Sequence, residues 1–159
     1  DVREAHSVTL REAMALAAGR DLIARQYLNG YAELFELGLH SLPPAFSLQP
    51  EAAEAASADA ATAAAVQQLY LALLARLPDS HIVRKHGEAV AQNVMRSAQG
   101  FAERAAAGEA LAGDPAWAAW DAELKQQRIN PGTTADFTVA TLLLAGLAER
   151  PGRPAPGPR

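Results

Sequence analysis

Apolar residues recur at spacings of three and four between residues 66 and 77, and this repeat constrains the fold more than any other feature. An α-helix places residues three and four apart on one face, so the repeat is typical of a helix that faces a core. The repeat consists of Val66, Leu69, Tyr70, Leu73, Leu74 and Leu77. Pro78 follows directly and cannot continue a helix. We therefore predict a helix over residues 59–77.

The composition extends this expectation to the rest of the chain. Of 159 residues, 50% are hydrophobic and only 6% are aromatic. Alanine and leucine dominate, and both lose little side-chain freedom in a helix, whereas strands favour β-branched and aromatic residues. The sequence therefore predicts an all-α fold: one bundle-like domain of about six helices over residues 1–149.

Prolines, glycines and capping residues bound the other predicted helices. We expect them over residues 8–18, 21–39, 79–107 and 133–148, with another beginning at Asp114. Gly87 and Gly100 should weaken the helix over 79–107 without necessarily ending it. Residues 45–57 are expected to form a loop. Residues 150–159, rich in proline, glycine and arginine, are expected to form a disordered tail.

Charge and cysteine content exclude several classes of function. The net charge of -4 argues against a nucleic-acid binder, which usually has a basic surface. The sequence has no cysteine, which excludes disulfides and thiolate metal sites and is consistent with a cytoplasmic location. No apolar run approaches the roughly 20 residues of a membrane span. The chain begins with Asp1, so we expect it to be the C-terminal part of a larger all-α protein.

Three segments have residues suited to chemistry, and the first is the predicted helix over residues 21–39. Asp21, Arg25, Asn29 and Glu33 recur every four residues and form one polar stripe. The simpler interpretation is a solvated edge with an Asp21–Arg25 ion pair. The alternative is that both flanks are packed and that Arg25 and Asn29 line a polar cavity.

The second segment begins the predicted helix over residues 79–107. Asp79, His81, Arg84, Lys85 and His86 lie within its first eight residues. Cations beside a helix start favour phosphate binding. The alternative is that Asp79 is an N-cap and that the cations face water. The two histidines are five residues apart, so they do not share a face as in a helical zinc site.

The third segment is the Asn130-Pro131-Gly132 turn and the start of the predicted helix after it. Asp136 is the only charged residue of that mostly apolar helix before Glu149, so we expect a buried carboxylate. The residue could close a capping box with Thr133. It could instead help to hold a magnesium–nucleotide complex beside the turn.

Two of these segments together resemble the ATP:dephospho-CoA triphosphoribosyltransferase family. The matching stretches are DSHIVRKHGEAVAQNV (residues 79–94) and NPGTTADFTVATLLLAGL (residues 130–147). Residues 20–39 resemble a subgroup of methanogens and methylotrophs, whose genes accompany one-carbon cofactor genes. Family members are all-helical and about twice as long, and their N-terminal Lys-Pro-Gly and Asn-Thr motifs are absent from this chain.

The resemblance implies transfer of a triphosphoribosyl group from ATP to the ribose hydroxyl of dephospho-CoA, with release of adenine. It implies phosphate contacts from His81, Arg84 and Lys85, and backbone donors from Asn130 to Gly132. Asp79 and Asp136 become candidate ligands of Mg²⁺ or of the ribose, and His86 a candidate general base. The expected partners are ATP and CoA-like molecules, with neither nucleic acid nor membrane, and the chain is expected to form a homodimer.

Two alternatives stay open on the sequence. One keeps the fold and uses a different acceptor in methanopterin- or methanofuran-type cofactor metabolism. The other is a non-catalytic helical interaction module in which the charged residues are caps and solvated faces.

Overall fold

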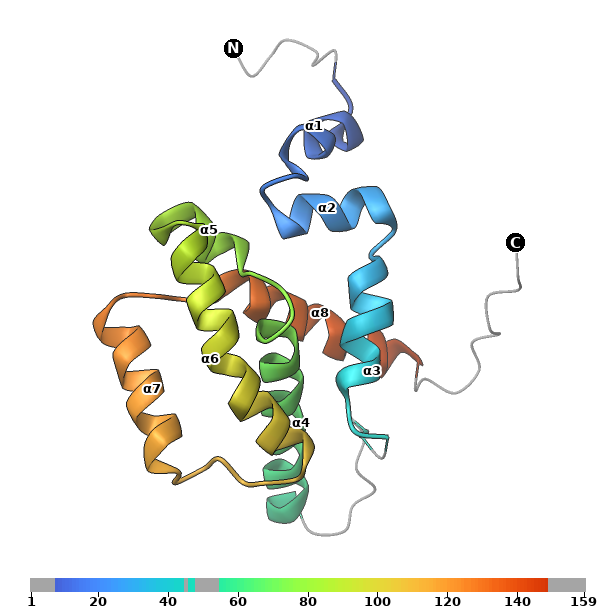
Figure 1. Cartoon of the computed structure of the whole chain (residues 1–159). Coiled ribbons are helices and arrows are strands. Elements are labelled where there is room, and N and C mark those ends of the chain that lie inside the picture. Colours follow the sequence, from blue (N-terminus) through green and yellow to red (C-terminus); the bar gives the residue numbers. More distant parts are fainter. Residues whose placement is uncertain (1–7, 45, 48–54, 149–159) are drawn as a thin grey trace.

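The computed structural model of the protein describes residues 8–44, 46–47 and 55–148 (Figure 1). These residues form helices and connecting turns without a strand, so the predicted all-α fold is confirmed. The helices are α1 (Leu10–Ala17), α2 (Leu22–Asn29), the π-helix η1 (Leu34–Gly38), α3 (Leu39–Ser41), α4 (Ala55–Leu74), α5 (Ser80–His86), α6 (Glu88–Ala106), α7 (Pro115–Gln126) and α8 (Gly132–Ala148). The predicted tail lies outside the described residues, as do residues 45 and 48–54 of the predicted loop. Residues 55–57, also predicted as loop, instead belong to α4.

Helix α4 is the centre of the fold, with α6 alongside it and α8 crossing it (Figure 1). Its C-terminal half is buried on two sides. Leu71 and Leu74 pack into a cluster with residues of α5 and α6, while Leu69 and Leu73 pack against η1 and α8. The predicted apolar repeat is therefore confirmed as far as Leu74, where α4 ends, whereas Leu77 lies in the turn that follows. The helix is apolar on more than one face. Helix α4 therefore lies between α5 and α6 on one side and η1 and α8 on the other.

The predicted helix over residues 21–39 is divided into shorter pieces, which corrects the single helix expected. Helix α2 ends at Gly30, whose φ is 70°, and Tyr31 follows with a φ of 64°. These left-handed conformations stop the α-helical hydrogen bonds, and the chain resumes as the π-helix η1. The break turns η1 and α3 toward α8.

Gly87 likewise ends a helix that the sequence predicts to be continuous. Its φ of 89° and ψ of 163° lie in a region that residues with a Cβ rarely enter. The chain changes direction there, and α6 then runs back along α4. Gly100, the other glycine of this segment, lies within α6 and leaves that helix unbroken.

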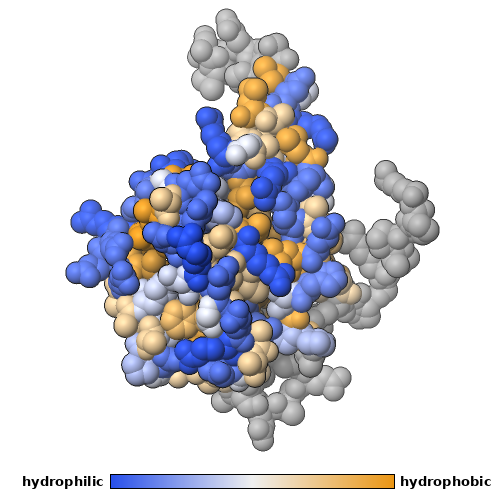
Figure 2. Space-filling model, in the orientation of Figure 1, coloured by the Kyte–Doolittle hydropathy of each residue, from blue (hydrophilic) through white to orange (hydrophobic). Residues whose placement is uncertain are grey.

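Helix α1 projects from the rest of the fold together with α2 (Figure 1). Thr9 and Glu12 close a capping box at its start, in which Glu12 accepts hydrogen bonds from the Thr9 N–H at 2.7 Å and from the Thr9 hydroxyl at 2.8 Å. None of the α1 residues is buried, and Leu16 is 83% exposed. Hydrophobic side chains are correspondingly visible on this projecting part of the surface (Figure 2).

Helix α8 is less buried than its apolar sequence predicts. Phe137 and Thr141 are buried against the fold, but Val139 is 67% exposed and Leu143 is 62% exposed. These two residues lie four apart and so share one face of the helix. Helix α8 therefore has one face in the core and one apolar face in water.

Candidate functional site

The buried carboxylate of Asp79 joins the two family-like segments. Its Oδ1 accepts hydrogen bonds from the N–H groups of His81 at 2.9 Å and Ile82 at 3.1 Å, which caps α5. Its Oδ2 accepts hydrogen bonds from the N–H of Thr134 at 2.7 Å and from the Thr134 hydroxyl at 2.8 Å. Asp79 is completely buried, so these four bonds replace its hydration. The starts of α5 and α8 are thus held together by one side chain.

A second polar link brings the start of α2 to the same place. The hydroxyls of Ser80 and Thr133 are 2.9 Å apart, and the N–H of Leu22 donates to the Ser80 hydroxyl at 3.3 Å. Thr133 therefore bonds across the fold to Ser80. We define the residues around Asp79, Ser80, Thr133 and Thr134 as the helix junction.

His81 lies between α5 and α8 at the helix junction. The Nδ1 of His81 is 3.0 Å from a guanidinium nitrogen of Arg84. Because an arginine can only donate, Nδ1 accepts and the ring proton lies on Nε2. The Nε2 atom is buried without a hydrogen-bond partner among the described residues. A Cβ at Gly132 would lie 3.3 Å from the imidazole ring, so this glycine leaves room for the ring.

His86 holds the turn that precedes α8. Its Nε2 is 3.2 Å from the carbonyl oxygen of Arg128, and only a protonated Nε2 can donate there. In neutral His86 the basic nitrogen is therefore Nδ1. The role of general base stays a prediction.

The other predicted site residues at this end of the fold are open to water. Arg84, Lys85, Asn130 and Asp136 are exposed. The buried carboxylate expected at position 136 was wrong, because the first turn of α8 presents this residue outward. The N–H of Gly132 is already used, since it donates to the Asn130 carbonyl oxygen at 2.8 Å.

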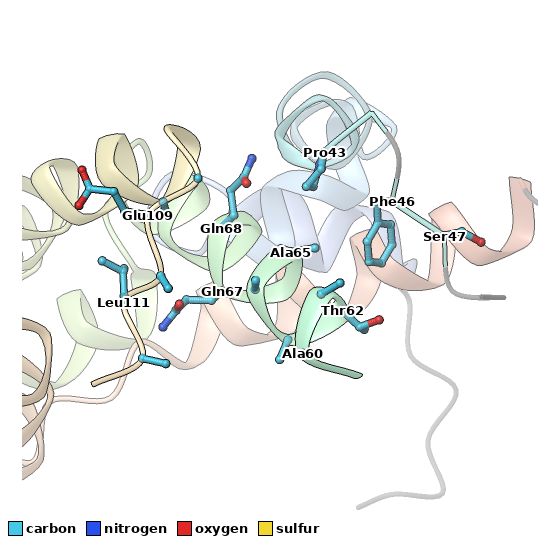
Figure 3. A pocket seen from close by; sticks show the side chains of 17 residues that line it. Pro43, Phe46, Ser47, Ala60, Thr62, Ala65, Gln67, Gln68, Glu109 and Leu111 are labelled. Atoms are coloured by element: carbon cyan, nitrogen blue, oxygen red, sulfur yellow. The ribbon is translucent and has the colours of Figure 1, made fainter. Parts of the chain in front are cut away.

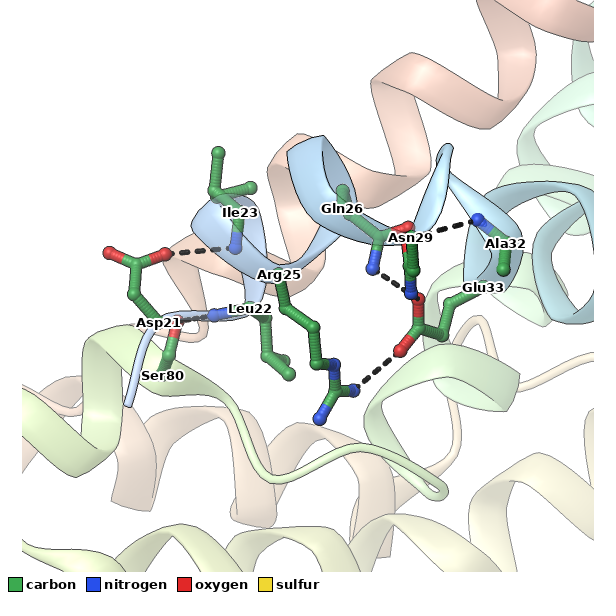
Figure 4. A network of polar contacts seen from close by, with 9 residues as sticks. All are labelled: Asp21, Leu22, Ile23, Arg25, Gln26, Asn29, Ala32, Glu33 and Ser80. Carbon is green, nitrogen blue, oxygen red and sulfur yellow. Dashed lines mark hydrogen bonds and ion pairs between the residues drawn. The ribbon is translucent and has the colours of Figure 1, made fainter. Parts of the chain in front are cut away.

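The polar residues of α2 form a network that is closed by Glu33 (Figure 4). The Glu33 carboxylate pairs with Arg25 at 2.7 Å and accepts hydrogen bonds from Asn29 at 2.5 Å and from the buried side chain of Gln26. Asp21 caps α2 through the N–H groups of Ile23 and Ala24, so the predicted Asp21–Arg25 pair was wrong. Gln26, which the stripe of every fourth residue omits, is the most buried member.

Glu33 should make the α2–η1 break sensitive to acid. Burial raises the pKa of Glu33, but hydrogen bonds from Asn29 and Gln26 and the charge of Arg25 outweigh burial, so the pKa lies below the ordinary value of 4.5. A lowered carboxyl pKa stabilises the fold above the unfolded-state value, and this stability is lost as the pH falls through the folded-state pKa.

We therefore expect Glu33→Gln to lower the free energy of unfolding at pH 7 by about 1 kcal/mol. The difference from the unsubstituted protein should shrink as the pH falls through the folded-state pKa of Glu33, which lies below 4.5, because Glu33 is then protonated in both states. Urea titrations between pH 7 and pH 3 measure this difference. A gap that stays constant over the range would show that the charge of Glu33 does not stabilise the break.

A family sequence model described as ATP:dephospho-CoA triphosphoribosyl transferase (CitG) matches residues 1–154 of the chain. The chain belongs to this family. It is a transferase that moves a triphosphoribosyl group from ATP to dephospho-CoA, leaving adenine. The match does not favour the one-carbon or interaction-module alternatives, and the subgroup stays a prediction. No curated protein and no solved structure gives a significant match.

The residues of this transferase do not form a ready magnesium site at the helix junction. Four donors occupy the oxygens of Asp79, so the predicted ligand has no free lone pair for a metal. Asp136, the other predicted Mg²⁺ ligand, has an exposed carboxylate. Among the described residues no group of three or more histidine, aspartate or glutamate side chains is arranged to bind a metal.

Two hollows border α4 of the transferase. One, of about 880 Å³, lies between the N-terminal half of α4, the 108–112 turn and Phe46 (Figure 3). The other, of about 590 Å³, lies between α4, α7 and α8. None of the helices in the described part of the chain is long and apolar enough to cross a membrane.

The sequence reasoning missed the residues that assemble the site. Ser80, Thr133 and Thr134 hold the helix junction, but serine and threonine at a helix start ordinarily indicate local capping. The sequence contained one signal: both family-like segments have such residues near the expected helix start, Ser80 in one and Thr133 and Thr134 in the other. The hydrogen bond between Thr134 and Asp79 joins residues 55 positions apart, and no local sequence pattern predicts such a contact.

Proposed function

We propose that the helix junction and the cations of α5 bind the triphosphate of ATP in this triphosphoribosyl transferase. The observation that supports the proposal is the set of four hydrogen bonds to Asp79, which fixes the 79–86 segment against the 130–136 segment. A phosphate site needs cations and donors that do not have to be reorganised when the ligand arrives. The buried Asp79 supplies such a rigid base.

Arg84 and Lys85 are the proposed phosphate contacts. Both are exposed beside the helix junction, and Arg84 is oriented by its hydrogen bond to His81. A guanidinium keeps its charge and binds phosphate oxygens with two donors at once. His81, the third predicted phosphate residue, would act through Nδ1, which accepts a hydrogen bond from Arg84 and orients its guanidinium.

The transfer breaks the bond between C1′ of the ATP ribose and adenine, which leaves with the bonding electrons. The acceptor hydroxyl of dephospho-CoA then bonds to C1′ and gives up its proton, while the departing adenine takes up one proton, so no net proton is gained or lost. Positive charge develops on the ribose in between, and a nearby carboxylate stabilises it. We assign that role to Asp136, and proton acceptance to Nδ1 of His86.

Adenine release tests the proposed function directly. The protein is incubated with ATP and dephospho-CoA, and adenine is separated and quantified by chromatography. We expect adenine to appear only when both nucleotides are present, together with an equal amount of triphosphoribosyl-dephospho-CoA. A folded protein that forms neither product would contradict the proposal.

Arg84→Met should weaken ATP binding at least tenfold, since one charge-assisted hydrogen bond to phosphate contributes roughly 1.5–3 kcal/mol. Isothermal titration calorimetry with ATP measures the loss. Arg96→Met is the matched control, because Arg96 is an exposed arginine of α6 that bonds to Asn93 outside the site. Equal ATP affinity in both variants would remove Arg84 from the site.

The same proposal extends to the cellular setting. ATP is expected to bring Mg²⁺ on its phosphates, with Asp136 as the exposed carboxylate beside it. Since ATP and dephospho-CoA are intracellular nucleotides, we place the enzyme in the cytoplasm. The net charge of -4 supports small-molecule partners over nucleic acid. The exposed Leu10 and Leu16 of α1 support a homodimer.

A further inference from the structure

The hollow between α4, α7 and α8 is an apolar groove with features of a ligand site. Its walls include Val66 and Tyr70 of α4, Trp117, Trp120 and Leu124 of α7, and Val139 of α8. Its volume of about 590 Å³ lies in the range of small-molecule pockets. The two tryptophans form an aromatic cluster with Phe101, their centroids lying 5.4 and 5.2 Å from its ring, so this wall is rigid.

The groove begins beside the helix junction. Ala135 and Thr138 line it from the first two turns of α8, directly after Thr134, which bonds to Asp79. The Thr138 hydroxyl donates to the Thr134 carbonyl oxygen at 2.8 Å, which ties the groove wall to the same turn. The start of α8 is therefore shared by the helix junction and the groove.

The polar groups of the groove are suited to an uncharged ligand. Burial, with smaller contributions from the charges of Asp79 and Asp121, raises the pKa of Tyr70 to about 12, so its hydroxyl stays protonated and can donate. The Gln67 amide also lines the groove. Asp121 also lines the groove, and its carboxylate would repel a phosphate group. The groove is therefore better suited to the uncharged part of a ligand.

We propose that this groove binds the pantetheine arm of dephospho-CoA, the acceptor, while its nucleotide end lies toward the helix junction. The arm is a long uncharged chain with a dimethyl branch, two amides and a terminal thiol. Its methyl groups would contact the tryptophans and Val139, and its amides would bond to Gln67 and Tyr70. This inference rests on the proposed function, since it takes the acceptor from that reaction.

The groove contains its own optical probe, because Trp117 and Trp120 are the two tryptophans of the chain. Dephospho-CoA should change their fluorescence, whereas ADP, which has the nucleotide part without the arm, should not. Ala135→Phe narrows the groove from an exposed position and should raise the dissociation constant for dephospho-CoA at least tenfold, with ATP affinity unchanged.

Leu143→Phe is the matched control, because Leu143 is exposed on the same helix but does not line the groove. Val139→Asp, also at an exposed position, is a second variant that should weaken dephospho-CoA binding if Ala135→Phe perturbs folding. Unchanged tryptophan fluorescence with dephospho-CoA, or equal affinity in Ala135→Phe and Leu143→Phe, would overturn the inference.

The fluorescence titration is independent of adenine release. A fluorescence change without adenine formation would contradict the proposed function and support the groove. Adenine formation with unaltered dephospho-CoA affinity in Ala135→Phe would support the function and reject the groove.

Discussion

Asp79→Ala is expected to lower the free energy of unfolding by about 3–5 kcal/mol, the range for removing a buried, fully bonded charged group. The substitution leaves the N–H groups of His81, Ile82 and Thr134 and the Thr134 hydroxyl without their acceptor. Water cannot replace the carboxylate easily at a completely buried position. Urea titration followed by circular dichroism measures the loss.

Asp114→Ala provides the matched control for that experiment. Asp114 caps α7 through the N–H groups of Ala116 and Trp117, as Asp79 caps α5, and it pairs with Arg104 of the preceding helix. It has no bond to a second helix start, so we expect a clearly smaller loss of stability than for Asp79→Ala. Equal losses in the two variants would mean that the link to Thr134 adds nothing beyond capping.

Gly38→Ala should cost about 2–3 kcal/mol, because η1 approaches α8 too closely for a side chain at that position. An added Cβ would lie 3.1 Å from Cγ2 and 3.3 Å from Cβ of Thr141, and closer still to its hydroxyl. Thr141 is completely buried and its hydroxyl donates to the Phe137 carbonyl oxygen at 2.8 Å, so it has little room to move. Thermal and urea unfolding both report the loss.

Gly100→Ala is the control, because Gly100 lies within a helix where an added Cβ would contact no other side chain. No heavy atom lies within 4 Å of an added Cβ there, so the substitution should stabilise α6 by roughly 0.5–1 kcal/mol. In a protein that already has Thr141→Ala, adding Gly38→Ala should lower the free energy of unfolding much less than it does in the unsubstituted protein. If the loss persists in that background, the contact with Thr141 is not its cause.

Both destabilising substitutions act on the attachment of α8, and this links stability to the proposed site. Asp79 fixes the first turn of α8, and Gly38 lets η1 pack against its middle. Residues 132–139 contribute to the helix junction and to the groove. A variant that loosens α8 should therefore weaken ATP and dephospho-CoA binding together, unlike Arg84→Met or Ala135→Phe.

Local sequence patterns were sufficient for the elements whose signals are themselves local. The apolar repeat from Val66 to Leu77 predicted α4, and Asp114 with Pro115 predicted the start of α7. Pro78 marked the end of the segment before α5. Such signals depend on side-chain spacing and on backbone groups within one or two turns, which the sequence contains in full.

The breaks at Gly30 and Gly87 depended on more than local preference. A glycine inside a helical pattern lowers helix stability by roughly 1 kcal/mol. Tertiary packing can outweigh this cost, so a helix can continue through one glycine and end at another. Gly100 stays helical, whereas Gly87 adopts a φ of 89° because α6 must return along α4. The sequence does not contain that return path.

By itself the sequence determined the all-α class, the position of α4 and the family-like segments at residues 79–94 and 130–147. Only the tertiary structure decided that Asp79 is a buried bridge, that Asp136 faces water and that Glu33 rather than Asp21 pairs with Arg25. The physical reason is that helix formation follows from residues within about four positions of each other. The burial and partners of a polar side chain are instead set by residues that reach it only after the helices have packed.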